Sequence, residues 1–505
     1  MRKILLFIFL ICISSNLYSQ QFSVGFKKAG FETVANTDWG TDVIVSNAEP
    51  LGKPSAIARP NGTVYVVIPD TTTIPGFSLL LYRSTNFGNT WTRLSSGITS
   101  NPGVVISKTK LVRSGLDSIY CFFQSGYSIY SWNIENNNFN PFPYTNHRDF
   151  DVDASSTGNL YIFIDSLGTN NIVRYGSTNG GSNWLGRGLI TNGGAHPKVK
   201  FSGSGDTLIL NYYGPVLADT ATSIIRAARY RETTPGTMAS AGFQDVALET
   251  VAKTEFKSVM YGGTVWFFYT MGTSGSIDIN ARVSISSGST YGTAFPVAGN
   301  PNVDEYWFDA NYNKSNNGGV DLVYFSDSLQ SGLPTNNTDK IAYTYSNITN
   351  PNTFAAPTRI SEHPPVWSPN GYNPVLAEFY DSPGDNGVIW VGLDGTAKRL
   401  YWDRYLLFTN ITNTNTIAES YTLKQNYPNP FNPATKIEFS LPKDGFVTLK
   451  IYNMLGQEVR TIISQNLNNG SYNVDFNASQ LSSGAYFYKL QVNDFSDIKK
   501  MIIQK

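Results

Sequence analysis

Short apolar runs bounded by turn residues recur along most of the chain, whereas runs with the period of an amphipathic helix are hard to find. Each run follows a strand-like segment and a turn with Gly, Asp or Asn, and leads to a further strand that often carries Arg and Tyr. About seven such units follow one another at spacings of roughly forty to sixty residues, which is typical of repeat proteins. The apolar runs are TVYVVI from Thr63, SIYCFF from Ser118, LYIFI from Leu160, TLILNYY from Thr207, TVWFFYT from Thr264, VDLVYF from Val320 and VIWVG from Val388.

The continuity of these runs decides between two all-β architectures. Strands buried on both faces read as continuous apolar runs, as in sheets repeated around an axis, whereas a single sandwich gives a cleaner alternation. The pattern therefore predicts an all-β chain whose residues 20–410 form a β-propeller of about seven blades. The strand-like segment TDVIVSN, residues 41–47, precedes the first unit. We expect it to pair beside Tyr401 in the last unit, with Val43 and Val45 buried, and so to close the ring.

The C-terminal part of the chain alternates instead of running continuously. Val447, Leu449 and Ile451 alternate with polar or aromatic neighbours, and two similar stripes begin at Tyr472 and Tyr486. This pattern predicts a small immunoglobulin-like β-sandwich over residues 421–505, joined to the propeller by a polar linker over residues 411–420.

Composition and charge narrow the class further. The 37 basic and 37 acidic residues cancel, so net charge gives no attraction to nucleic acid. Residues 1–19 have the basic start and apolar core of a signal peptide, and the rest of the chain shows no transmembrane anchor. Cys121 then has no intramolecular disulfide partner and is expected to be a buried structural thiol.

Side chains for metal or cofactor chemistry are sparse. The three histidines, His147, His196 and His363, have no metal-ligand spacing, and no phosphate-binding or dinucleotide-binding motif is present. The sequence therefore predicts neither a metal nor a cofactor. The loop DSPGDNG from Asp381 leaves calcium open, although a polar turn is favoured because the ligand order of a calcium loop is missing.

Three turn sequences connect this chain to a known type of propeller. They are STNFGNTW from Ser84, STNGGSNW from Ser177 and the more degenerate SISSGSTY from Ser284. They resemble the Asp-box of BNR repeats in sialidase-like propellers, in which a glycine shapes a tight turn and an aromatic residue plugs the blade. Asn86, Asn179 and Ser286 stand where the family has aspartate. The resemblance covers roughly residues 50 to 408 and implies fold more than function.

The same resemblance implies candidates for a catalytic site. Sialidases use a tyrosine nucleophile assisted by a glutamate, and three arginines that hold the substrate carboxylate. Glu255 and Tyr372 open the fifth and seventh units, where the family places this pair, and Arg59, Arg226 and Arg282 are the candidates for the substrate-binding arginines. This chain lacks the Arg-Ile-Pro motif that opens the family's sequence, and it has about seven units where the family has six.

The tail carries a second resemblance. Its motifs are YPNPFNP from Tyr427, Leu441-Pro442, IYNMLG from Ile451, SGAY from Ser483 and a closing Lys499-Lys500. In this order they closely resemble the type A C-terminal sorting domain of type IX secretion cargo in Gram-negative bacteria. The resemblance implies that residues 421–505 engage the type IX secretion machinery, and that the protein is secreted or displayed on the outer cell surface.

Two hypotheses for the body follow. The first is a binding propeller for an extracellular glycan or protein, with aromatic residues at its rim. The alternative is a sialidase-like glycoside hydrolase acting on extracellular polysaccharide, which needs Glu255 and Tyr372 to converge at one point.

Overall fold

Every regular element in the described part of the chain is a β-strand, which confirms the predicted all-β class. Within that part, no helix is long and apolar enough to cross a bilayer. The predicted signal peptide, Tyr372 and residues 381–386 of the polar loop lie outside the described residues. The computed structural model describes residues 42–46, 53–59, 62–70, 78–86, 88–94, 98, 104–114, 118–202, 206–214, 224–249, 253, 255–273, 277–298, 303–313, 319–327, 339–361, 363–366, 374–379, 387–395, 397–404, 408–413, 418–456, 458–478 and 481–504.

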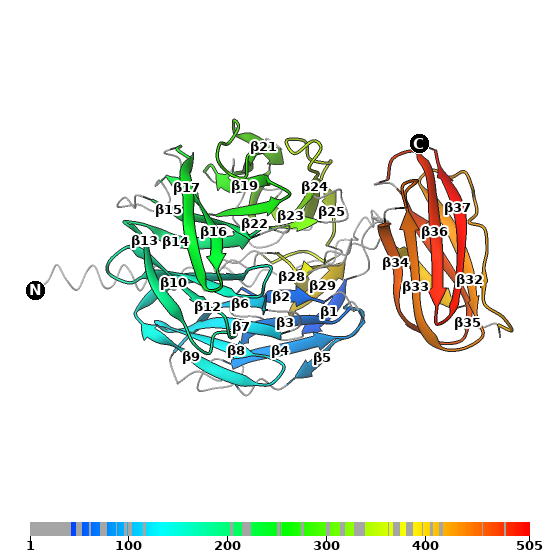
Figure 1. Cartoon of the computed structure of the whole chain (residues 1–505), viewed down its shortest axis with the longest axis horizontal. Helices are drawn as coiled ribbons and strands as arrows, with labels where there is room; N and C mark the ends of the chain where they lie inside the picture. The colour runs from blue at the N-terminus through cyan, green and yellow to red at the C-terminus, as the bar shows by residue number, and fades with distance from the viewer. Residues whose placement is uncertain are drawn as a thin grey trace, which may run out of the picture.

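The strands between residues 43 and 404 form seven sheets in the described part of the chain (Figure 1). Sheet 1 contains β2 (Ser55–Ala58), β3 (Val64–Asp70), β4 (Ser78–Ser84), β5 (Thr92–Leu94) and, beside β2, β27 (Glu378–Phe379). Sheet 2 contains β6 (Ile106–Ser114), β7 (Ser118–Ser125), β8 (Ser128–Asn133) and β9 (Asn138–Thr145). Sheet 3 contains β10 (His147–Ala154), β11 (Leu160–Ser166), β12 (Asn171–Ser177) and β13 (Leu185–Asn192). Sheet 4 contains β14 (Ala195–Phe201), β15 (Thr207–Tyr213), β16 (Ile225–Thr234) and β17 (Thr237–Ala247).

The remaining three sheets of this region repeat the same order. Sheet 5 contains β18 (Phe256–Tyr261), β19 (Thr264–Met271), β20 (Asp278–Ser284) and β21 (Phe295–Ala298). Sheet 6 contains β22 (Asp304–Asn313), β23 (Gly319–Asp327), β24 (Lys340–Ser346) and β25 (Thr358–Arg359). Sheet 7 contains β26 (Val375–Leu376), β28 (Gly387–Asp394), β29 (Ala397–Arg404) and, at its outer edge, β1 (Val43–Ser46).

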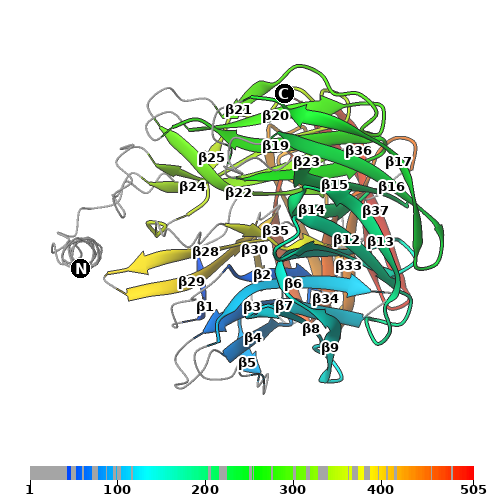
Figure 2. The same cartoon turned by 90° about the vertical axis from the view of Figure 1, so that its left-hand side faces the viewer.

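The sheets follow one another around a common centre (Figure 2). Each sheet has one inner strand, which is β26 in sheet 7 and the strand named first above in the other six sheets. Each inner strand contacts the inner strand of the next sheet. The sequence of contacts runs from β2 through β6, β10, β14, β18, β22 and β26 and returns to β2. This radial order is the architecture of a β-propeller.

Apolar side chains fill the space between each pair of neighbouring sheets. The cluster between sheets 1 and 2 contains Tyr65, Leu79 and Phe123, and the one between sheets 7 and 1 contains Val66 and Ile389. The apolar runs identified in the sequence supply much of these clusters because both faces of each second strand are covered. Cys121 is fully buried in the first of them, as expected, and burial raises the pKa of its thiol.

Two strands join the ends of this region. β1 pairs with β29, with Ile44 opposite Tyr401, so the predicted pairing of the N-terminal segment is confirmed. Val45 is buried as expected, but Val43 is only half-buried because β1 is an edge strand. β27 adds a short parallel pairing to β2 in sheet 1.

The three Asp-box-like turns share one hydrogen-bond pattern. In each turn the first serine's Oγ accepts from the glycine amide four residues later, at 2.8 Å for Gly88, 2.8 Å for Gly181 and 2.9 Å for Gly288. The residue in the aspartate position replaces the carboxylate as acceptor: the Asn86 Oδ1 accepts from the Thr90 amide at 3.0 Å. All three glycines have φ between +79° and +90°, a region that glycine adopts without steric cost.

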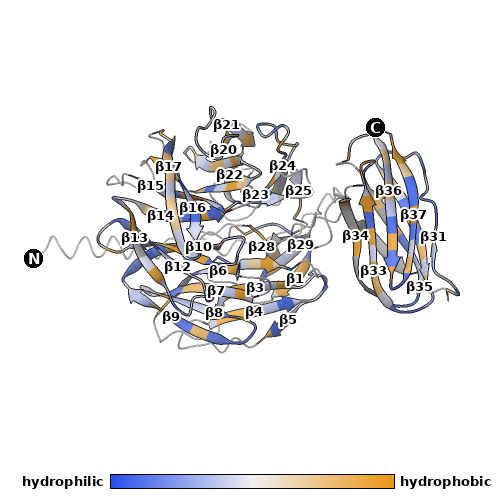
Figure 3. Ribbon diagram, viewed as in Figure 1, coloured by the Kyte–Doolittle hydropathy of each residue, from blue (hydrophilic) through white to orange (hydrophobic). Residues whose placement is uncertain are grey.

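The C-terminal strands form two further sheets. One contains β30 (Phe408–Asn413), β31 (Thr422–Leu423), β32 (Ala434–Leu441) and β35 (Gly470–Asn477), and the other contains β33 (Gly445–Tyr452), β34 (Glu458–Leu467), β36 (Gly484–Val492) and β37 (Phe495–Ile503). Their inner faces share one apolar core, which includes Ile437 and Val474 from the first sheet and Leu449 and Leu490 from the second. Figure 3 shows the matching alternation of hydrophilic and hydrophobic residues along β36 and β37.

The segment with three prolines runs into β32 along the edge of this unit. The Phe431 amide donates to the Ile502 carbonyl at 3.1 Å, and the Phe431 carbonyl accepts from the Gln504 amide at 3.0 Å. The flanking Pro430 has no amide hydrogen to donate, so an extended edge position suits it.

The close packing of the Gly88 turn on sheet 7 generates a stability prediction. A Cβ on Gly88 would lie 1.8 Å from the Trp402 Nε1, at a φ of +90°. We expect Gly88→Ala to reduce the free energy of unfolding by about 2–4 kcal/mol, from overpacking and backbone strain together. Gly168→Ala is the matched control because it has a φ of +82° and nothing within 4 Å of the added Cβ. It should lose about 1 kcal/mol from strain alone, as measured by denaturant unfolding. Equal losses would contradict the packing.

Candidate binding site at the centre of the ring

The inner strands have backbone amides that their own sheets leave without a hydrogen-bond partner. In the described residues, each inner strand except β2 pairs with one strand only, and β2 has just the short pairing with β27 on its other edge. These edges carry amides that need other partners. Side chains from the preceding sheet accept from these amides. The Asp151 Oδ2 accepts from the Val199 amide and the Asp153 Oδ2 from the Phe201 amide, both at 2.8 Å.

The same solution recurs at other junctions between sheets. The Ser55 Oγ accepts from the Leu111 amide at 2.8 Å, and the Asp309 Oδ2 accepts from the Leu376 amide at 3.0 Å. The inner strands therefore need polar side chains that accept these hydrogen bonds. Because most of these side chains are carboxylates, they bring charge to the centre of the ring.

Several charged residues from different sheets gather there, and we name them the axial cluster. Lys198 on sheet 4 and Asp309 on sheet 6 both shift the pKa of Lys53, which precedes the first strand of sheet 1. The three residues therefore lie near one another at the centre. The axial cluster consists of Lys53, Lys108, Lys110, Asp149, Asp151, His196, Lys198, Glu255, Lys257 and Asp309.

One carboxylate of the cluster is shared by two lysines and a histidine. The Asp149 Oδ1 lies 2.6 Å from the Lys108 Nζ, and its Oδ2 lies 3.0 Å from the His196 Nδ1 and 3.9 Å from the Lys198 Nζ. The Lys198 side chain retains 37% of its exposure and that of His196 retains 40%, whereas Asp149 retains 13%. The solvent-facing side of this group therefore carries the Lys198 ammonium and the His196 ring, and the carboxylate lies beneath them.

The local pKa shifts agree with this arrangement. Burial alone would raise the pKa of the Asp149 carboxyl, but Lys108, Lys198 and His196 outweigh it and hold that pKa well below its usual range. Burial lowers the pKa of Lys108 to about 8, although Asp149 opposes the shift. For Lys198 the attraction of Asp149 and Asp151 outweighs burial, and its pKa is raised. Lys198 is therefore a fixed positive charge at neutral pH.

A second part of the axial cluster is nearly balanced in charge. The Lys257 Nζ lies 2.7 Å from the Asp309 Oδ1. Burial lowers the pKa of Lys53, while Asp309 and Glu255 oppose this shift. Burial would raise the pKa of Asp309, but Lys257 and Lys53 outweigh it and lower that pKa. Excess positive charge therefore lies on the side of Lys108 and Lys198.

Two inner strands are strained near the start of the cluster. His196 and Trp307 have φ values of +53° and +50°, in a region that non-glycine residues seldom adopt. The strand register shifts at both positions, between Ala195 and Lys198 and between Tyr306 and Phe308. Strain of this kind concentrates at functional sites, where it aims a side chain that regular geometry would place elsewhere.

The arginines predicted to hold a substrate carboxylate lie on three different sheets. Arg59 pairs with Glu135, and Arg226 makes two hydrogen bonds to Asp245, at 2.6 and 3.2 Å. Arg282 lies 3.3 Å from the Glu249 Oε1. Each guanidinium group is thus engaged by a carboxylate of its own.

Glu255 lies at the centre of the ring, where it has a structural partner. Its Oε2 accepts from the Phe308 amide at 3.1 Å, which is the capping role that Asp151 and Asp309 have at other junctions. The proposed approach of Glu255 to Tyr372 stays a prediction because Tyr372 lies outside the described residues.

The chemistry of the axial cluster is that of an anion-binding site. Ammonium groups supply positive charge, and His196 supplies a ring that is 40% exposed. Within the described residues, no group of three or more His, Cys, Asp or Glu side chains is placed to hold a metal ion. Sequence reasoning missed this site, although the alternation of Lys108 with Lys110, Asp149 with Asp151 and Lys198 with Lys200 was visible in it.

Comparisons with known proteins identify the tail. Residues 425–504 match the family described as "Secretion system C-terminal sorting domain". The predicted resemblance to type IX secretion cargo is therefore confirmed, and the protein is secreted or displayed at the cell surface. Its sorting domain implies engagement with the type IX secretion machinery.

The rest of the chain has distant structural likenesses. No curated protein matches the chain. An α-L-arabinofuranosidase from Fusarium graminearum is 11% identical with a TM-score of 0.39, over 73% of this chain and 98% of the other. An ulvan lyase is 10% identical with a TM-score of 0.43, over 72% and 94%. A Hadza microbial sialidase is 11% identical with a TM-score of 0.38, over 60% and 66%.

The buried position of Lys108 generates a titration prediction. Competitive acetylation across a pH series, followed by peptide mass spectrometry, should give a midpoint of about 8 for the Lys108 amine. Asp149→Asn should move the midpoint lower, because Asp149 opposes the effect of burial. A wild-type midpoint near the ordinary lysine value of about 10.4 would show that Lys108 is not desolvated.

Proposed function

We propose that the seven sheets are the blades of a seven-bladed propeller with Asp-box turns, closed by β1 and β27. The cyclic contacts of the inner strands and the apolar clusters between neighbouring sheets support this number. The C-terminal sandwich is immunoglobulin-like and serves as the sorting domain. β30 extends past the predicted propeller end at residue 410 and pairs with β35, so the C-terminal unit starts at Phe408.

The exported propeller binds an acidic extracellular glycan at the axial cluster. The observation that carries this proposal is the sharing of Asp149 among Lys108, His196 and Lys198. A uronic or sialic carboxylate can approach the Lys198 ammonium, which lies 3.9 Å from the Asp149 Oδ2 and is already held in place. Such a pre-organised cation binds a carboxylate at a smaller entropic cost than a free lysine does.

A second candidate is a sialidase-like glycoside hydrolase in which Glu255 and Tyr372 act as the catalytic pair. The central position of Glu255 supports it, while the bond from the Phe308 amide and the pairing of Arg59, Arg226 and Arg282 with three different carboxylates favour binding. Release of monosaccharide from a bound acidic glycan, lost in Tyr372→Phe, would establish the hydrolase and replace the binding role.

The binding proposal predicts the effect of removing one cation. The chain without residues 1–19 should bind uronic-acid and sialic-acid oligosaccharides on an array and leave neutral oligosaccharides unbound. Lys198→Ala should weaken the strongest acidic ligand about tenfold by calorimetry, which corresponds to about 1.4 kcal/mol. Added salt should weaken binding further because the attraction is electrostatic.

Lys340→Ala is the matched control because it removes a lysine on β24, the third strand of sheet 6. It should bind as the wild type does. Equal affinities of the Lys198→Ala variant and wild type, or preferential binding of neutral oligosaccharides, would refute the axial cluster as the binding site.

A further inference from the structure

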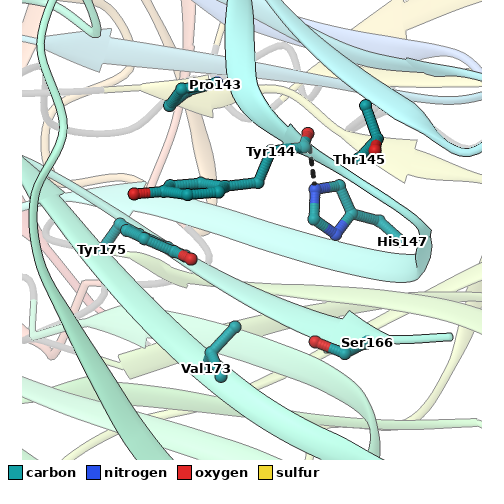
Figure 4. A pocket seen from close by; sticks show the side chains of 7 residues that line it. All are labelled: Pro143, Tyr144, Thr145, His147, Ser166, Val173 and Tyr175. Carbon is teal, nitrogen blue, oxygen red and sulfur yellow. Dashed lines mark hydrogen bonds between the residues drawn. The ribbon is translucent and has the colours of Figure 1, made fainter. Parts of the chain in front are cut away.

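A pocket lies beside the axial cluster, at the junction of sheets 2 and 3 (Figure 4). Its volume is about 350 Å³. Strand β9 contributes its C-terminal end, β10 its first residue, β11 its last residue and β12 two residues, so the pocket lies at the start of the inner strand β10. Its lining residues are Pro143, Tyr144, Thr145, His147, Ser166, Val173 and Tyr175.

Two stacked tyrosines form one wall. The ring centroids of Tyr144 and Tyr175 are 4.9 Å apart at an interplanar angle of 27°. Tyr175 is buried, whereas Tyr144 is 46% exposed. Tyr144 therefore presents an aromatic surface whose orientation is fixed by the ring beneath it. Such surfaces bind the apolar face of a sugar ring at a small cost in side-chain entropy.

His147 forms the inner wall and carries an unused acceptor. Its Nε2 lies 2.9 Å from the Tyr144 carbonyl oxygen, which can only accept, so this nitrogen carries the proton and donates. Burial lowers the pKa of His147, which favours the neutral ring. Its Nδ1 then keeps a lone pair for which the described residues provide no donor, in a side chain that is 4% exposed. Figure 4 shows this nitrogen on the side of the ring away from the Tyr144 carbonyl.

The pocket is uncharged, in contrast to the axial cluster. Its polar groups are hydroxyls and a neutral imidazole, and Val173 and the two tyrosines supply apolar surface. This combination suits a neutral sugar residue, which has hydroxyls at its edge and C–H groups on its face. A free carboxylate would find no cation among the lining residues.

Two connections place the pocket next to the axial cluster. His147 and Asp149 are two positions apart on β10, which is roughly 7 Å along a strand. In addition, Asp165 is the neighbour of the pocket residue Ser166 on β11. Its carboxylate accepts two hydrogen bonds from Arg148, at 2.9 and 2.8 Å, and one from the His196 amide at 3.1 Å. The two sites are thus held in a fixed relation.

We propose that this pocket is a subsite for a neutral sugar residue next to the acidic residue bound at the axial cluster. This inference rests on the proposed glycan-binding function and specifies its ligand as an oligosaccharide that combines acidic and neutral residues. Tyr144 stacks on the neutral ring, and His147 and Ser166 are the groups that meet its hydroxyls.

Glycan length separates the two sites experimentally. The probes are glucuronic acid and the alternating glucuronic acid–N-acetylglucosamine disaccharide, tetrasaccharide and hexasaccharide, titrated by calorimetry into the chain without residues 1–19. Wild-type affinity should rise from the monosaccharide to the tetrasaccharide. Tyr144→Ala should abolish this rise and leave glucuronic acid binding unchanged, with a loss of about fivefold to twentyfold for the tetrasaccharide.

Two further variants control for structural effects. Tyr144→Phe keeps the ring and should bind as the wild type does. Tyr127→Ala removes a tyrosine in the turn between β7 and β8 that is 60% exposed and does not line the pocket, and it should also leave binding unchanged. Unchanged tetrasaccharide binding by a folded Tyr144→Ala variant would overturn the subsite and leave the axial cluster intact. Absence of binding to every probe by the wild type would overturn the proposed function and this inference together.

Discussion

The inner strands of the ring carry backbone amides that their own sheets leave unpaired, and side-chain acceptors on the preceding sheet satisfy several of these amides. Asp151, Asp153, Glu255 and Asp309 each accept from an amide on the following sheet, and Ser55 does so with its hydroxyl. An unsatisfied buried amide costs about 1–3 kcal/mol, so these positions are constrained to acceptors. The sheets are fastened at the centre by these bonds and farther out by apolar clusters.

This constraint explains why charge gathers at the centre. Carboxylates that cap amides are buried, and buried carboxylates need cations nearby. Lys110 lies 3.8 Å from Asp151, and Lys257 lies 2.7 Å from Asp309. Around Asp149 the cations exceed what pairing requires, because both Lys108 and Lys198 approach it. The proposed binding site uses this surplus of positive charge.

Much of the fold could be predicted from sequence because the second strands are buried on both faces and therefore form continuous apolar runs. The turns at Gly88, Gly181 and Gly288 could also be predicted, since their spacing fixes one hydrogen-bond pattern. The inner strands could not, because their polar residues face the axis and read like solvent-exposed positions. Glu255 shows the consequence: the sequence places it at the start of the fifth unit, but its bond to the Phe308 amide depends on a contact between sheets that local sequence does not encode.

Amide exchange at the edge of β14 tests the capping of inner strands most directly. Residue-resolved hydrogen–deuterium exchange should show that Asp153→Ala speeds exchange of the Phe201 amide at least about tenfold, the equivalent of about 1.4 kcal/mol. The Val199 amide, which Asp151 caps, should keep its protection, and Asp153→Asn should restore part of the protection at Phe201 because it retains a side-chain oxygen. Unchanged exchange at Phe201 in the Asp153→Ala variant would contradict the account, because it would show that the carboxylate does not secure this edge.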